Sequence, residues 1–63
     1  MSDAEHLIEN VIIAMAQGRD VDEELESPIN QEMLRYTGMR PGDLYDMAWH
    51  VVHVLYNGKY PKF

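Results

Sequence analysis

The sequence predicts an all-α protein, a compact three-helix bundle made by a single domain of residues 1–63. Three observations predict it. Apolar residues recur at the three- and four-residue spacing of a helix face, serine, proline and glycine stand where helices would begin and end, and no segment alternates as a strand does. The expected helices span residues 3–17, 28–37 and 41–57. A chain this short buries only about 60% of the surface that its unfolded form exposes, so a small core is expected.

The first helix is expected to begin with a capping box. Ser2 can accept a hydrogen bond from the third helical amide, while the carboxylate of Glu5 reaches back to the serine amide. Gly18, which tolerates a left-handed backbone, is the expected end. Ile13 falls in the middle of the polar face of this helix, so its apolar side chain is expected to face outward.

Residues 19–26 are expected to form a mobile or loosely helical acidic connection rather than a packed element. Five of the last seven residues carry a carboxylate, and repulsion among them disfavours packing. The five acids are Asp20, Asp22, Glu23, Glu24 and Glu26.

Proline marks the start of the other two helices. Ser27 suits the N-cap and Pro28 the first position of the second helix, which Gly38 ends. Pro41 begins the third helix, and its expected end is Asn57, before a short aromatic and basic tail. The expected core face of the third helix consists of Leu44, Ala48, Val51, Val52 and Leu55.

The third helix also carries a polar stripe that permits a metal site. Asp46, His50 and His53 share one face, and imidazole suits zinc, copper or nickel. The favoured interpretation is a solvated edge, because Asp43 and Asn57 continue the same stripe. No cofactor is therefore expected, and metal binding by these three residues is an alternative.

The composition narrows the class of partner. Eleven acidic residues against five basic ones give a net charge of −6, which disfavours direct binding to nucleic acid and favours a basic protein partner. The chain has no cysteine, an acidic amino terminus where a signal peptide would be basic, and no apolar run long enough to cross a bilayer. A cytoplasmic protein that does not bind membranes is expected. No phosphate loop occurs and both serines resemble helix caps, so an enzyme is not expected.

The predicted function is that of a non-catalytic protein-interaction module, a small acidic regulator or inhibitor that binds a basic partner and can form a homo-oligomer. So small a domain can hardly bury all six of its aromatic residues, and aromatic residues are enriched in interfaces. An alternative is nucleic-acid mimicry, in which the acidic helices occupy the DNA or RNA site of a binding protein or nuclease. The predicted partner-binding residues are the five acids above together with Tyr45, Trp49, Tyr56, Tyr60, Phe63 and Ile13.

Overall fold

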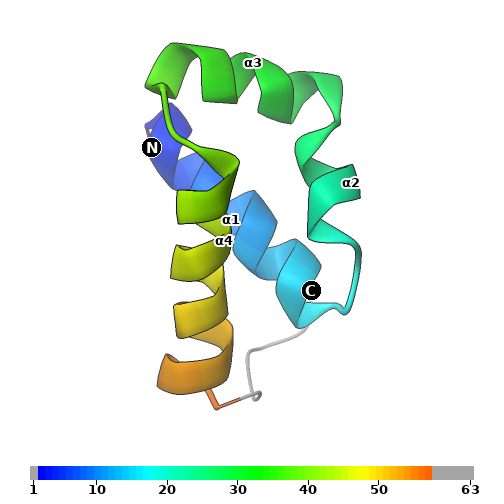
Figure 1. Ribbon diagram of the computed structural model, residues 1–63, viewed down its shortest axis with the longest axis vertical. Coiled ribbons are helices and arrows are strands. Elements are labelled where there is room, and N and C mark those ends of the chain that lie inside the picture. Colours follow the sequence, from blue (N-terminus) through cyan, green and yellow to red (C-terminus); the bar gives the residue numbers. More distant parts are fainter. Residues whose placement is uncertain (1, 58–63) are drawn as a thin grey trace.

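The structure, a computed structural model, describes residues 2–57 (Figure 1). The elements in chain order are α1 (Asp3–Ala16), α2 (Val21–Leu25), α3 (Pro28–Thr37), α4 (Pro41–His50) and a π-helical turn, η1 (Val51–Leu55). Within this described part the structure contains no strand, and the predicted all-α class is confirmed. The exact three-helix bundle is not confirmed, because the acidic connection contains a short helix of its own.

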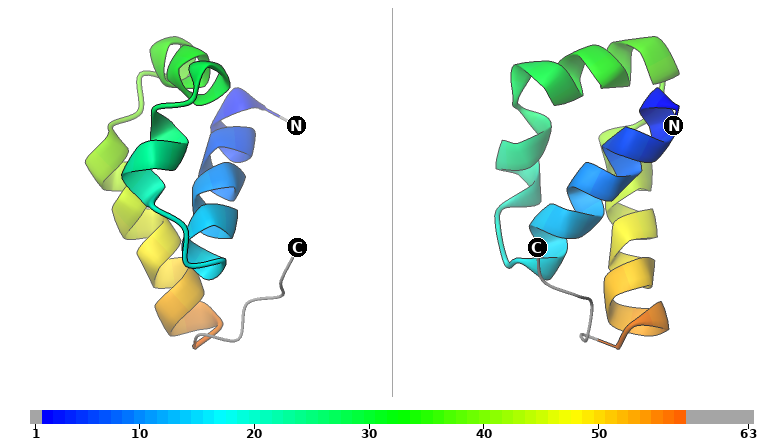
Figure 2. Two further views of the ribbon diagram at one scale, coloured as in Figure 1. Left: turned by 90° about the vertical axis from the view of Figure 1, so that its right-hand side faces the viewer. Right: turned by 180° about the vertical axis from the view of Figure 1, so that it is seen from behind.

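Helix α1 is the centre of the fold. It contacts α2, α3, α4 and η1, whereas α2 and α4 stand apart on either side of it. Figures 1 and 2 show α1 crossing α4, with α3 lying across one end of both and α2 running beside α1. The buried apolar core follows from this arrangement and consists of Leu7, Val11, Ile12, Val21, Leu25, Leu44, Ala48 and Val52.

The two ends of α1 form as the sequence predicts. The Ser2 hydroxyl oxygen accepts a hydrogen bond from the Glu5 amide at 3.2 Å, which is the serine half of the predicted capping box. At the other end Gly18 adopts a left-handed conformation, with φ of 74°. The Arg19 amide then donates to the Ala14 carbonyl at 2.8 Å, the pattern of a Schellman motif. This turn directs the chain back along α1.

Helix α2 contradicts the prediction of a loose acidic connection. Val21 and Leu25, four residues apart, share one helix face and are both buried in the core. Asp20 is the N-cap, and its Oδ1 accepts hydrogen bonds from the Asp22 and Glu23 amides at 2.9 and 3.3 Å. The free energy gained by burying the two apolar side chains outweighs the repulsion among the carboxylates, because the carboxylates can remain solvated on the other face of the helix. Asp20 followed by Glu23 three residues later resembles a capping box, which is typical of the start of a helix. The prediction missed this pattern because it was based on the charge of the segment.

The third predicted helix is divided into α4 and η1. The Tyr56 amide donates to the Val51 carbonyl at 3.0 Å, a bond that spans five residues instead of four. A π-helical turn rotates each residue through a smaller angle than an α-helix does. Val52 is still buried, but by Leu55 the accumulated difference has turned the side chain off the core face that a uniform α-helix would give it. Leu55, expected in the core, is 67% exposed, whereas Leu44 is completely buried.

One polar side chain lies inside the fold and ties three helices together. Asn30 of α3 is 0% exposed, and its Oδ1 accepts a hydrogen bond from Asn10 of α1 at 2.9 Å. Its Nδ2 donates to the carbonyl and carboxylate of Glu24 of α2, both at 2.7 Å, and to the Ser27 hydroxyl at 2.9 Å. Every polar atom of the Asn30 side chain thus has a partner, which is the condition for burying an amide without a large penalty.

Candidate functional site

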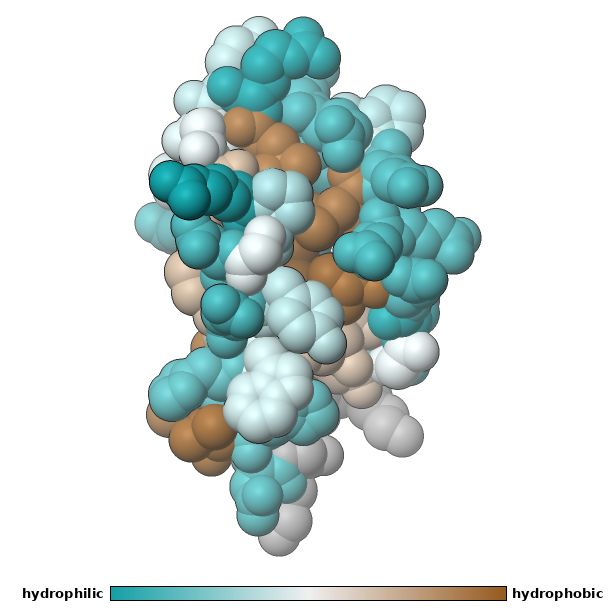
Figure 3. Space-filling view, in the orientation of Figure 1, coloured by the Kyte–Doolittle hydropathy of each residue, from teal (hydrophilic) through white to brown (hydrophobic). Residues whose placement is uncertain are grey.

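The face between α2 and α4 is the part of the surface where predicted partner-binding residues meet. No described helix covers the core between these two elements, and Figure 3 shows apolar surface in the middle of this face with more hydrophilic surface on both sides. A hollow of about 340 Å³ lies here, between the turn that follows α1 and the side of α4. We call it the Tyr45 hollow, after the residue that α4 contributes.

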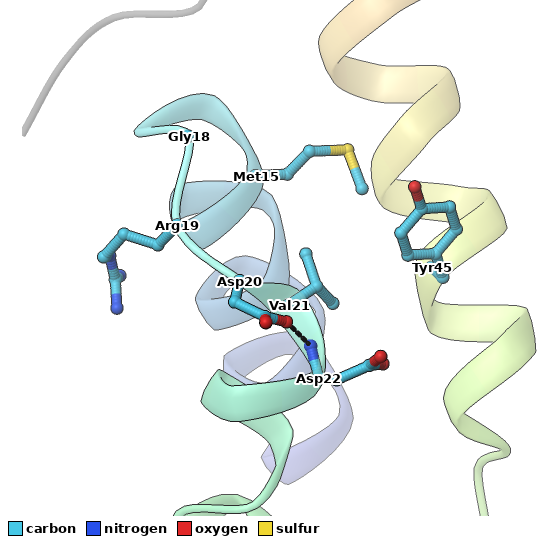
Figure 4. A pocket seen from close by; sticks show the side chains of 7 residues that line it. All are labelled: Met15, Gly18, Arg19, Asp20, Val21, Asp22 and Tyr45. Carbon is cyan, nitrogen blue, oxygen red and sulfur yellow. Dashed lines mark hydrogen bonds between the residues drawn. The ribbon is translucent and has the colours of Figure 1, made fainter.

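The inner surface of the Tyr45 hollow is apolar. Met15 of α1 and Val21 of α2 line it, and both pack in or against the hydrophobic core. Tyr45 faces them from α4 and is 47% exposed (Figure 4). An aromatic ring is thus held beside apolar side chains and still open to solvent, as is common where a protein binds another molecule.

Two carboxylates lie at the edge of the same hollow. Asp20 and Asp22 both line it, from the N-terminal end of α2. One Asp20 oxygen is engaged in capping α2, whereas the exposed Asp22 carboxylate has no hydrogen bond or ion pair within residues 2–57. Negative charge and an aromatic ring, which the sequence places more than twenty residues apart, are therefore brought to one site.

The nearby arginine does not neutralise these carboxylates. Arg19 donates to the Glu24 carboxylate at 2.7 Å and to the Gln17 side chain at 2.8 Å. Figure 4 shows its side chain directed away from Tyr45. A second hollow of about 310 Å³, lined by Arg19, Asp20, Glu23, Glu24 and Ser27, lies on the side where this ion pair forms. The negative charge at Asp22 is left facing solvent.

Glu24 has a different position from the one the sequence suggested. Its two carboxylate oxygens bind Arg19 and Asn30 respectively, and only 19% of its side chain is exposed. This carboxylate is therefore engaged in holding α2 and α3 together. Glu23 and Glu26 are exposed on α2, and of these two only Glu23 lines a hollow, the second one.

The remaining aromatic predictions fall along α4 and beyond it. Trp49 is 48% exposed and its ring packs against that of His53, with centroids 4.9 Å apart and planes at 46°. Tyr56 is also about half exposed. Tyr60 and Phe63 lie outside the described residues. Ile13, expected on the outer face of α1, is instead half-buried.

The polar stripe of the third helix does not assemble a metal site in the described part of the chain. Between residues 2 and 57, no group of three or more histidine, aspartate or glutamate side chains is placed so that it could hold a metal ion. Asp46, His50 and His53 are all exposed, and the His53 ring is packed on Trp49. Residues 2–57 therefore provide no cluster of ligands that would support the alternative of metal binding.

The helices of residues 2–57 are all too short or too polar to cross a lipid bilayer. Comparison of the chain with protein-family models, with curated proteins and with solved structures gives no match. Its function is accordingly inferred from its own residues and their arrangement.

Proposed function

We propose that this chain is a non-catalytic protein-interaction module, a small regulator or inhibitor that binds a basic partner protein through the face between α2 and α4. The observation that carries the proposal is the Tyr45 hollow. One depression is lined by a half-exposed tyrosine, apolar side chains and the Asp22 carboxylate, which has no ionic partner among residues 2–57. An aromatic residue at the centre and charge at the edge are the common composition of protein interfaces.

The charge of the chain supports a basic partner. The net charge of −6 favours encounter with a positively charged surface, and α2 adds the exposed Glu23 and Glu26 beside Asp22. Trp49, on the same helix as Tyr45, would extend the aromatic contact area. The cytoplasm stays the predicted compartment, because the chain contains no cysteine that could form a disulfide.

The test is capture of partners on the immobilised full-length chain, followed by titration calorimetry with each partner once it has been identified and purified. Tyr45→Ala is expected to weaken binding by about tenfold or more, the effect of truncating a central aromatic residue. Raising the salt concentration should weaken it further, because the opposed charges are solvent-exposed. Asp22→Asn should weaken binding in low salt and have less effect in high salt.

Ile29→Ala is the control, since Ile29 is an exposed apolar residue on α3 that does not line the hollow. It should leave the affinity unchanged. A purified partner whose affinity is the same for the wild type, Tyr45→Ala and Asp22→Asn would contradict the proposed face. If instead the partner is a nucleic-acid-binding protein and free nucleic acid displaces the chain from it, mimicry is the better description.

Self-association is a second proposal, favoured by a different observation. Met47, Val54 and Leu55 on α4 and η1 are 40, 52 and 67% exposed, and large apolar side chains that remain exposed are available to an interface. We expect sedimentation velocity to show a dimer whose population rises with protein concentration. Leu55→Ser should shift it to monomer, whereas Ile29→Ser should not. A wild-type chain that is monomeric at every concentration would exclude this role.

A further inference from the structure

We propose that the Tyr45 hollow binds one lysine or arginine side chain, presented by an extended basic segment of the partner protein. This inference rests on the proposed function and states its chemistry more narrowly. The group recognised is a cation at the end of a flexible apolar stem. Three properties of the hollow favour it: its volume, its division into apolar and charged parts, and the absence of a neutralising cation from residues 2–57.

The volume is sufficient for one long side chain and is small for a ligand pocket. Pockets that enclose small molecules or cofactors span about 300–1,000 Å³. The Tyr45 hollow, at about 340 Å³, is at the lower end of this range and opens widely to solvent. One long side chain can enter it while the main chain that carries this side chain stays outside.

The polar and apolar parts of the hollow are arranged as a lysine or arginine requires. The methylene stem of such a side chain packs favourably on apolar surface, here on Met15 and Val21, while its charged end stays near water. The face of the Tyr45 ring can contact the cation or its stem, since aromatic rings attract cations. Asp22 supplies the carboxylate, and its charge is available because nothing within residues 2–57 pairs with it.

The arginine that the chain itself places nearby is already engaged. Arg19 lines the hollow, but its guanidinium group is held by Glu24 at 2.7 Å and by Gln17 at 2.8 Å. The Glu24 carboxylate is also fixed from the other side by Asn30. Since this network holds Arg19 on the far side, an incoming cation meets the Asp22 carboxylate without competition from it.

The experiment is an NMR titration of the ¹⁵N-labelled full-length chain with blocked single amino acids. The probes are N-acetyl-lysine methylamide, the arginine equivalent, and the norleucine equivalent, which has the stem without the charge. The lysine and arginine probes are expected to shift the amides of residues 15–22 and 45 in a saturable manner. The norleucine probe should bind at least about fivefold more weakly than the lysine probe, because it can form neither the ion pair nor the cation–π contact.

Two variants localise the effect. Asp22→Asn should weaken binding of the lysine probe about threefold or more. Its control, Glu26→Gln, removes one charge from the C-cap of the same helix, outside both hollows, and should change the affinity less than twofold. Tyr45→Ala should reduce the preference for lysine over norleucine, because it removes the cation–π contact and leaves the Asp22 ion pair. Equal binding of lysine and norleucine, or equal effects of Asp22→Asn and Glu26→Gln, would overturn the proposal.

Other occupants give distinct results, and each would also overturn it. If Lys59→Gln with Lys62→Gln shifts the same amides in the absence of any probe, a lysine of the chain's own tail fills the hollow. If these amides shift when the unliganded protein is diluted, a second copy occupies it. Failure of the probes, combined with a purified basic partner whose binding still depends on Tyr45, would reject the side-chain subsite and leave the proposed function intact.

Discussion

Asn30→Ala is expected to destabilise the protein by roughly 2–4 kcal/mol, because it removes the shared partner of Asn10, Glu24 and Ser27 from a completely buried position. A core in a domain of this size rarely supplies more than about 3–5 kcal/mol, so most of the stability would be lost. Helical circular dichroism during urea unfolding gives the free energy of unfolding. A substitution that changes it by less than 1 kcal/mol would show that the buried amide is unimportant.

A double-mutant cycle with Asn10→Ala separates the hydrogen-bond network from simple loss of packing. Once Asn30 is gone, Asn10 has no partner to lose, so the double variant should cost less than the sum of the two single variants. A coupling free energy of about 0.5 kcal/mol or more is expected for groups in one such network. Strictly additive costs would mean that the 2.9 Å bond between the two side chains contributes nothing to stability.

Leu44→Ala is expected to cost roughly 2–5 kcal/mol, whereas Leu55→Ala should cost about 0.5 kcal/mol or less. A uniform helical wheel places both leucines on the core face, so the comparison tests the π-helical turn directly. Leu44 is completely buried between α4 and α1, while Leu55 lies past Val51 with 67% of its surface exposed.

The two leucine variants are best compared by urea unfolding at a dilution where the chain is monomeric, so that self-association does not add to the cost of Leu55→Ala. Both replacements remove the same atoms from a helix-favouring residue and leave another good helix former, so helix propensity differs little between them. Equal losses of stability would mean that Leu55 packs in the core and that the helix continues without a wider turn.

The candidate site was only partly predictable. The aromatic and acidic residues were both expected to contact a partner, and Tyr45, Asp20 and Asp22 do line one hollow. Their proximity depends on how α2 and α4 are placed around α1, and local sequence patterns do not predict this placement. Met15 and Val21 gave no functional signal, because an apolar residue at helical spacing indicates a core position and not the inner surface of a hollow.

Glu24 and Arg19 illustrate the same limit. In the sequence, Glu24 is one of five similar acids in a row, and only the fold distinguishes it by placing Asn30 and Arg19 on its two oxygens. Asn30 was missed because a single asparagine in a short amphipathic helix usually faces water. Its burial results from α1 and α2 converging on the start of α3.

The positions where the longer helices begin and end follow from local signals in the sequence. These signals act on backbone groups within three or four residues, so the helix ends can be predicted without knowledge of the rest of the chain. The residues that provide them are Ser2, Pro28, Gly38 and Pro41. Other features required the whole fold: α2 packs, Asn30 is buried, and Tyr45 lines the same hollow as Asp22. These features depend on free energy gained when segments distant in sequence exclude water together, and that gain exists only once α1 has its neighbours around it.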